Sequence, residues 1–230
     1  MSERKPLALI PARGGSKRFP RKNIASLAGR PLLAWSIAPA LESGLFDRVY
    51  VSSEDAEILA AAAACGGTPM LRPTALAGDK VALEPVCRDA LERLALQGEH
   101  YTDIVVLLPT SPFRDPARLV AAWEEHLRRD ADALVSICPY PHPPQWALRI
   151  DAQGLLLPFD QKGYDSERQD LELHYRHDGA YFISRVAAFL ETGYLLGSRA
   201  VPFRSAKRES VDIDDAMDLA WAEFLQEKKG

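Results

Sequence analysis

The sequence predicts an α/β protein whose central sheet is mostly parallel. Short apolar runs alternate with helical patterns along the chain, and this alternation is typical of parallel strands joined by crossover helices. The chain has 230 residues, of which 47% are hydrophobic and 26% charged, as in an ordinary globular protein. We therefore expect one domain over residues 1–230, with residues 139–175 forming an arm.

The first half of the chain carries clear turn and cap signals. Pro31 suits the first turn of a helix, and Ser53 suits a helix cap. The most apolar strand, 104–108, is predicted to be central. The elements expected in order are strand 7–10, helix 31–43, strand 49–51, helix 54–65, a turn-rich region 68–79, helix 84–96 and strand 104–108.

The second half begins with a helix that starts at Pro116 and a strand at 133–137. From Cys138 onward four prolines interrupt regular structure, and a hairpin is expected around residues 151–154. Residues 139–175 cannot form a core alone, so they either contact something else or make a long surface excursion. The elements expected here are helix 116–129, strands 133–137, 148–150, 155–157, 180–183, 200–203 and 211–213, and helix 215–226.

Charge and cysteine content exclude several classes of protein. The net charge of −4 argues against general binding to nucleic acid or to an acidic membrane surface. The three cysteines are widely spaced and include no metal-type pair, which favours reduced thiols and a cytoplasmic location. Residues 1–5 precede only a short apolar run, so we expect neither a signal peptide nor a membrane anchor.

The loop after the first strand, residues 11–23, is strongly basic although the whole chain is acidic. Its five cations are Arg13, Lys17, Arg18, Arg21 and Lys22. They surround Gly14 and Gly15, and such a concavity lets backbone N–H groups and side chains face one polyanion. Neither the P-loop spacing nor the dinucleotide-binding glycine pattern is present. A solvated basic loop is the alternative, but the position after a buried strand favours a phosphate site.

Asp212 and Asp214 are two residues apart on a predicted strand, so their carboxylates are expected on the same face. Two carboxylates repel unless a cation lies between them, and Mg²⁺ with phosphate oxygens is the usual solution. Pairs of this kind also cap helices, which keeps a structural alternative open. The five histidines show no metal spacing, and no serine-nucleophile motif supports a hydrolase.

Taken together, the motifs resemble those of the acylneuraminate cytidylyltransferases and their relatives that act on legionaminic and pseudaminic acids. Residues 10–23 read IPARGGSKRFPRKN. Four further motifs follow in the expected order: PTSP at 109–112, RQDL at 168–171, RHDG at 176–179 and VDID at 211–214. The resemblance spans nearly the whole chain. It implies a three-layer Rossmann-like nucleotidyltransferase fold, with the arm serving dimerisation.

The resemblance also implies a reaction, in which CTP and a nine-carbon α-keto acid sugar give a CMP-sugar and pyrophosphate, with Mg²⁺ as cofactor and a homodimer as the assembly. Lys22, Asp212 and Asp214 become candidate catalytic residues, and the two aspartates become metal ligands. The implied triphosphate contacts are Arg13, Ser16, Lys17, Lys22 and Asn23. Arg72 is implied at the cytosine base and Arg168 and Arg176 at the sugar, where a guanidinium fork suits a carboxylate. An ordinary loop role for Arg72, and ion pairs with nearby acidic residues for the other two, stay open.

Three departures from the family pattern concern substrate selection. Leu108 replaces a Gln, residues 80–83 replace a run of small residues, and Asp178 replaces an Asn near the expected sugar pocket. Asp178 is therefore a candidate substrate contact for an amino or hydroxyl group. The alternatives are an eight-carbon keto acid or a sugar 1-phosphate as substrate, or a non-catalytic nucleotide-binding regulator.

Overall fold

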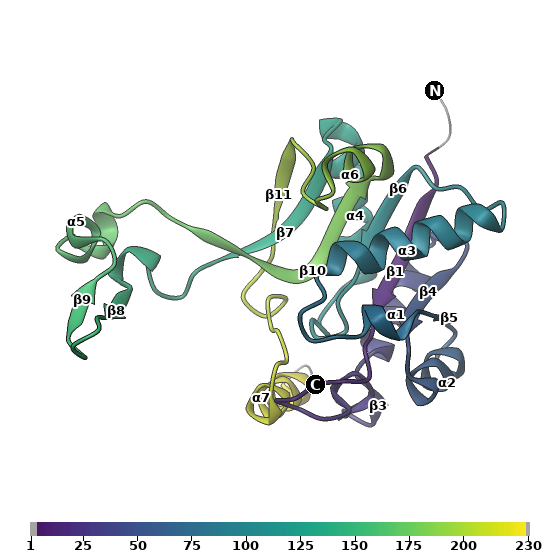
Figure 1. Ribbon diagram of the computed structural model, residues 1–230, viewed down its shortest axis with the longest axis horizontal. Coiled ribbons are helices and arrows are strands. Elements are labelled where there is room, and N and C mark those ends of the chain that lie inside the picture. The colour runs from purple at the N-terminus through teal and green to yellow at the C-terminus, as the bar shows by residue number, and fades with distance from the viewer. Residues whose placement is uncertain (1–3, 229–230) are drawn as a thin grey trace.

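The computed structural model describes residues 4–228, which form an α/β protein around one seven-stranded sheet (Figure 1). The strands are β1 (Pro6–Pro11), β4 (Val49–Ser53), β5 (Thr68–Leu71), β6 (Asp103–Val106), β7 (Ala133–Pro139), β10 (Tyr175–Arg185) and β11 (Ala200–Arg204). Their order is β11-β7-β10-β6-β1-β4-β5, and only β10 runs antiparallel to its neighbours. The mostly parallel sheet and the central place of β6 were predicted, and both are confirmed.

Helices cover both faces of the sheet and give three layers. They are α1 (Ala34–Glu42), α2 (Ala56–Ala64), α3 (Leu83–Leu96), α4 (Pro116–Arg129), α5 (Gln161–Tyr164), α6 (Val186–Thr192) and α7 (Ala216–Glu227). Buried side chains of α1, α2 and α4, such as Ile37, Ile58 and Leu119, share one apolar cluster with the sheet. Those of α3 and α6, such as Leu94 and Phe189, share a second cluster with other strand residues. The three-layer prediction is confirmed.

The direction of the chain through the sheet reverses at β1, which pairs with β4 on one side and β6 on the other. In open α/β sheets, ligands bind outside the carboxyl ends of the strands at such a point. The basic loop 11–23 follows β1, and residues 107–112 follow β6. The fold thus brings the two loops that the sequence singled out to one edge of the sheet.

Pro31 does not start a helix, which corrects one prediction. It lies in the two-residue strand β3 (Arg30–Pro31), which pairs with β2 (Ser26–Leu27) as a hairpin. Ala28 and Gly29 at the turn have φ of 49° and 78°, as a tight hairpin turn requires. Helix α1 begins only at Ala34, because the hairpin uses the preceding residues.

Two more local predictions were wrong. Asp55, not Ser53, caps α2, and its side chain accepts from the N–H groups of Glu57 and Ile58. Residues 68–71, predicted as part of a turn-rich region, form the edge strand β5 beside β4. Pro69 is tolerated there because an edge strand leaves one side of its backbone unpaired.

Residues 211–213 do not form the predicted strand. The segment is irregular, and its tie to the loop after β6 is a bond from the Ile213 N–H to the Thr110 carbonyl, 2.8 Å long. Ile213 is buried with Leu27 and Leu32 of the hairpin region and Ala222 of α7. The segment is therefore held by side-chain packing rather than by a ladder, and the same-face argument for Asp212 and Asp214 does not apply.

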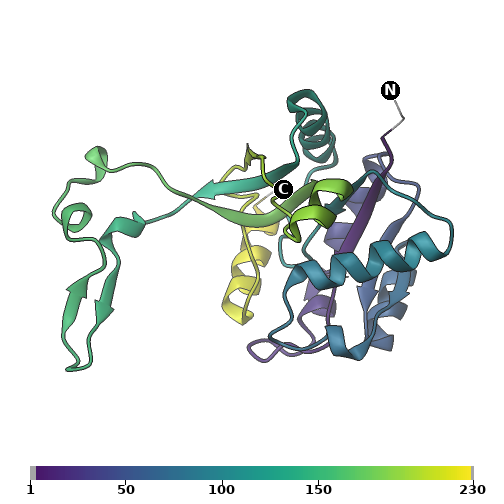
Figure 2. The ribbon, with the colours of Figure 1, turned by 45° about the horizontal axis from the view of Figure 1, so that its top comes forward.

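Residues 140–174 form an arm that extends away from the body at the ends of β7 and β10 (Figures 1 and 2). It contains the hairpin of β8 (Leu148–Ile150) and β9 (Leu156–Pro158), as predicted, and the short helix α5. Large apolar side chains on the arm are exposed to solvent. They are Leu148, Ile150, Leu155, Leu156, Leu157, Phe159, Tyr164 and Leu173.

Residues 1–3 and 229–230 lie outside the described residues, so part of the N-terminal segment 1–5 and the ends of the predicted domain are not covered. Among residues 4–228, no helix has the length and apolar character needed to span a membrane. Cys65, Cys87 and Cys138 are free thiols.

A buried carboxylate at the opposite edge of the sheet makes stability depend on pH. Asp103 accepts from Arg4 at 2.7 Å and from Thr102 at 2.7 Å, and lies 3.0 Å from Nε2 of His126. Burial alone would raise its pKa, but these hydrogen bonds hold the pKa below the ordinary value. Since the folded pKa is the lower one, the stabilisation is present above about pH 4 and is lost as pH falls through the folded value.

Replacing Asp103 with Asn should remove that dependence. We expect urea unfolding of D103N to show a smaller loss of stability between about pH 5 and pH 2 than the unmodified protein. At neutral pH the variant should be less stable, because Arg4 loses its buried partner. Equal acid sensitivity in both proteins would contradict the assignment.

Candidate active site

The basic loop after β1 lines a cavity of about 370 Å³ at the carboxyl edge of the sheet. It brings together all five predicted triphosphate residues: Arg13, Ser16, Lys17, Lys22 and Asn23. Asn23 is buried and donates to the Arg13 carbonyl at 2.8 Å, which fixes the two ends of the loop. The loop is therefore a preformed turn rather than a solvated tail.

The cations of this loop are paired with two carboxylates. Asp79 contacts Arg13 at 2.9 Å and Lys17 at 2.7 Å. Asp214 contacts Arg18 at 2.9 Å and Lys22 at 3.0 Å. The hydrogen bond from Lys17, with the nearby Arg13 charge, lowers the pKa of Asp79, so this carboxylate is ionised at neutral pH. The sequence did not single out Asp79 as a partner of the loop.

A second cavity, of about 270 Å³, adjoins the first and shares Arg13, Lys22 and Asn23 with it. Arg72 lines it from one side, and Leu108, Pro109 and Thr110 of the loop after β6 also line it. Arg72 is only 4% exposed. Its guanidinium is held by Glu54, which sequence reasoning missed because it is 18 positions away along the chain.

Asp212 and Asp214 lie on the irregular segment that leads into α7 and line different cavities. Burial raises the pKa of Asp212, and the negative charge of Asp214 raises it further. Burial also acts on Asp214, but the hydrogen bond and charge of Lys22 lower its pKa below the ordinary value. The two carboxylates therefore influence each other even though they are not on a strand.

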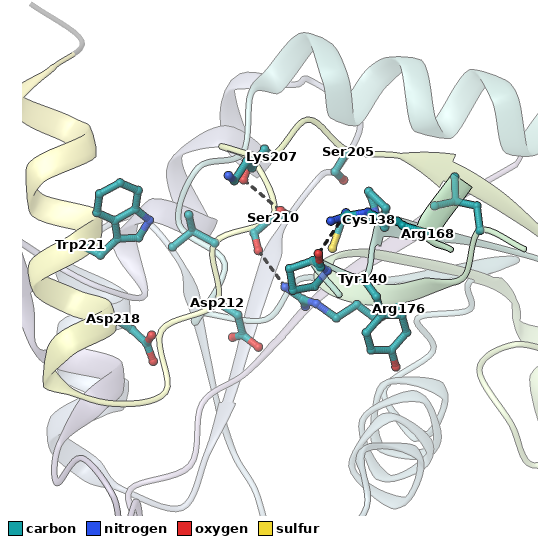
Figure 3. A pocket seen from close by; sticks show the side chains of 14 residues that line it. Cys138, Tyr140, Arg168, Arg176, Ser205, Lys207, Ser210, Asp212, Asp218 and Trp221 are labelled. Atoms are coloured by element: carbon teal, nitrogen blue, oxygen red, sulfur yellow. Dashed lines mark hydrogen bonds between the residues drawn. The ribbon is translucent and has the colours of Figure 1, made fainter. Parts of the chain in front are cut away.

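A third and larger cavity, of about 740 Å³, opens on the other side of this segment (Figure 3). It contains the predicted sugar residues Arg168 and Arg176 together with Asp212. Both guanidinium groups donate to backbone carbonyls: Arg168 to Pro141 at 3.2 Å, and Arg176 to His177 at 3.2 Å and Ser210 at 3.4 Å. Neither forms an ion pair within residues 4–228, so the ion-pair alternative is not supported.

Several residues of this cavity were not predicted. Tyr140 and Leu173 come from the base of the arm, Lys207 and Ser210 from the segment after β11, and Trp221 from α7. Figure 3 shows Asp212 and Arg176 reaching into the same space from different elements. These positions carry no motif, because each reaches the cavity only through the tertiary fold.

Asp178 lies elsewhere than predicted. It is 1% exposed and lies in a bulge of β10, where its Oδ1 accepts from the Ser136 hydroxyl and, at 3.0 Å, from the Ala180 N–H. It is not part of the lining of the three cavities. Next to it, Gly179 has φ of 77°, a left-handed conformation that suits glycine, and the register of β10 against β7 shifts at this point.

The buried Arg114 connects this bulge to the loop after β6. Its guanidinium donates to the carbonyls of Leu108, Ser111, Gly179 and Ala180 and to the Ser36 hydroxyl. Burial lowers its pKa to about 10, so it stays protonated at neutral pH. One residue separates Arg114 from the PTSP motif, but this spacing does not predict the hydrogen-bond partners of its guanidinium.

The carboxylates present fit a magnesium ion. Mg²⁺ keeps several waters and is bound through one or two carboxylates together with substrate phosphates. Asp212 and Asp214 are such a pair, and Asp212 has a raised pKa that a nearby cation would lower. Within residues 4–228 no cluster of three or more potential protein ligands occurs, so an all-protein cage is not the kind of site found here.

Comparisons with known proteins show which proteins this chain is similar to. The sequence model of a family described as cytidylyltransferase matches residues 7–228. A pseudaminic acid cytidylyltransferase of Campylobacter jejuni subsp. jejuni serotype O:2 is 35% identical over 222 residues, 96% of each chain. A CMP-N,N'-diacetyllegionaminic acid synthase of Legionella pneumophila is 33% identical over 229 residues, again 96% of each chain. An N-acylneuraminate cytidylyltransferase of Escherichia coli O18:K1:H7 is 33% identical over 98% of this chain and 53% of its own length.

Among solved structures, a CMP:2-keto-3-deoxy-manno-octonic acid synthetase in complex with CTP has a TM-score of 0.69 at 15% identity. The match covers 98% of this chain and 100% of that one. At this identity the likeness concerns the fold alone.

Proposed function

This chain belongs to the cytidylyltransferase family, and from that membership we propose that it activates a nine-carbon α-keto acid sugar with CTP. The products are the CMP-sugar and pyrophosphate. The relatives that support this substrate class are named for pseudaminic, legionaminic and N-acylneuraminic acids. The observation that carries the proposal is the placement of Asp212 and Asp214, which lie between a basic cavity and a larger cavity with two arginines.

In this scheme the loop of residues 13–23 holds the triphosphate, and Lys22 neutralises charge next to Asp214. Arg72 contacts the cytosine ring in the second cavity. The keto acid lies in the third cavity, where Arg168 and Arg176 bind its carboxylate, since a guanidinium fork matches a carboxylate in geometry. Both substrates then approach the Asp212–Asp214 segment from opposite sides.

The reaction forms a bond between a hydroxyl oxygen of the sugar acid and the α-phosphorus of CTP. The bond between the α-phosphorus and the bridging oxygen breaks, pyrophosphate leaves, and the hydroxyl proton passes to solvent. Positioning and charge neutralisation supply most of the rate enhancement in such transfers. Asp212 and Asp214 would hold Mg²⁺, which, when bound, withdraws electron density from the phosphate oxygens. The free thiols fit a reducing compartment, and we place the reaction in the cytoplasm.

The test is pyrophosphate release from CTP and Mg²⁺ with a panel of acceptors. The panel contains N-acetylneuraminic, legionaminic and pseudaminic acids, an eight-carbon α-keto acid and a sugar 1-phosphate. Turnover with a nine-carbon acid is expected. Turnover only with another acceptor would contradict the substrate class, and CTP binding without turnover on any acceptor would favour a regulator.

The assembly we propose is a homodimer formed through the arm. Ile150 and Phe159 are 72% and 76% exposed, and a surface of this kind on an extended arm marks an interaction site. The arm also supplies Tyr140, Arg168 and Leu173 to the third cavity, so dimerisation would order the sugar site.

Replacing Ile150 with Glu should disrupt this dimer. We expect the unmodified protein to sediment at about twice its chain mass of 25.4 kDa, and I150E to sediment as a single chain with a higher KM for the keto acid. Gln153→Glu, on the exposed turn of the same hairpin, is the matched control and should remain dimeric. Identical sedimentation of I150E and the unmodified protein would rule out this interface.

A further inference from the structure

Glu54 bridges the phosphate loop and the base pocket. Its Oε1 accepts from the Gly14 N–H at 2.7 Å, and its Oε2 accepts from Nε and Nη2 of Arg72 at 3.1 and 2.8 Å. Both carboxylate oxygens are thus used, one on each substrate-binding element. No sequence motif and no comparison assigns a role to this residue.

The turn that contains Glu54 lies directly against the basic loop and also bonds the backbone of Arg72. A Cβ added to Gly14 would lie 2.7 Å from Oδ2 of Asp55, the neighbour of Glu54, so the loop backbone rests directly on this turn. The Arg72 N–H donates to the Ser53 carbonyl at 3.0 Å, which attaches the base pocket to the same turn. The turn between β4 and α2 therefore contacts both elements, and the Glu54 side chain forms hydrogen bonds to both of them.

The contact also selects which part of Arg72 is available. Glu54 occupies the Nε and Nη2 edge of the guanidinium, and Arg72 lines the second cavity. Within residues 4–228, Nη1 makes no hydrogen bond, so it is the donor left for a carbonyl oxygen of a pyrimidine ring. Without a fixed Nε edge the long side chain would sample several rotamers, and the position of that donor would be lost.

We propose that Glu54 is a positioning residue that sets the distance between the base contact of Arg72 and the basic loop, which it holds by the backbone at Gly14. This distance matters for CTP binding, because the base and the α-phosphate of one CTP molecule must reach their partners at the same time. The proposal rests on the proposed function in one respect, the assignment of Arg72 to the base.

Glu54→Gln is the appropriate variant, because it preserves side-chain volume but offers one acceptor oxygen instead of two. The amide cannot accept from Gly14 and Arg72 together. We expect the Kd for CTP, measured by calorimetry with Mg²⁺, to rise about tenfold, the effect of one lost charge-assisted hydrogen bond. The KM for the keto acid should not change, and kcat at saturating CTP should fall less than about threefold.

Coupling to Arg72 separates this role from a general structural one. In an Arg72→Ala background the amide can serve Gly14 alone, so adding E54Q should weaken CTP binding by less than about twofold. Glu125→Gln removes an arginine-paired carboxylate on α4, far from the site, and is the matched control for the charge change. The unfolding temperature of E54Q shows whether the fold is preserved.

Two results would overturn the proposal: unchanged CTP affinity in E54Q, or the same loss in both the unmodified and the R72A backgrounds. A protein that shows this coupling but releases no pyrophosphate with any acceptor would support the role of Glu54 and contradict the proposed reaction. A protein that does not bind CTP at all would contradict both.

Discussion

Replacing Asp214 or Asp212 with Asn is expected to reduce pyrophosphate release by about a thousandfold, the largest effect on activity that the structure suggests. Asp214 contacts Lys22 at 3.0 Å and Arg18 at 2.9 Å, and Asp212 lines the third cavity. An amide keeps the shape of either side chain but removes the charge that would hold Mg²⁺. The measurement is the initial rate of pyrophosphate release as a function of Mg²⁺ concentration.

Asp215→Asn is the matched control, because Asp215 is one residue further along the same segment. Its side chain caps α7 by accepting from the Met217 and Asp218 N–H groups, and Asn caps a helix equally well. D215N should therefore retain nearly full activity. If D212N and D214N kept both their turnover and their Mg²⁺ dependence, the metal assignment would be wrong.

Replacing Arg114 with Met should cause the largest loss of stability, about 3–5 kcal/mol of unfolding free energy. The guanidinium is buried and makes five hydrogen bonds, four of them to backbone carbonyls. Methionine fills the volume but leaves these carbonyls without donors in a dry environment. Urea unfolding at neutral pH, followed by circular dichroism, measures the change.

Activity should fall with stability, because Arg114 fixes the loop after β6. That loop lines the second cavity at Leu108 and Thr110, and the Thr110 carbonyl holds the Asp212–Asp214 segment through Ile213. Arg128→Met removes an exposed arginine of α4, the helix that begins two residues after Arg114. Arg128 bonds Glu125, and its loss should change stability little. Similar losses in both variants would contradict the special role of Arg114.

The sequence predicted well what depends on local pattern. Apolar runs and helix signals located most strands of the sheet and most of the helices that cover it. The basic loop was recognised because its cations lie close together in the chain. The predictions failed where tertiary contacts decide. Pro31 entered a hairpin instead of a helix, and residues 211–213 are fixed by packing against α7 rather than by strand pairing.

The site could be predicted only as far as its motifs extend. Arg13, Lys22 and Asp214 line one cavity, but Asp178 is buried in the bulge of β10, where it bonds Ser136 and Ala180. The bridge between Glu54 and Arg72 joins residues 18 positions apart, and Arg114 reaches acceptors more than 60 positions away. Contacts of this kind depend on how the strands pair, and no spacing along the chain encodes that pairing.

The paired state of the basic loop has a consequence for how a triphosphate would enter. Asp79 and Asp214 already pair with four cations of the loop, so an incoming polyanion competes with these two carboxylates for the positive charge. Binding is then an anion exchange, in which each new phosphate contact is offset by a lost side-chain contact. The affinity for CTP should therefore depend on ionic strength less steeply than expected for a loop of five unpaired cations. Selectivity should come from the fit of the whole nucleotide.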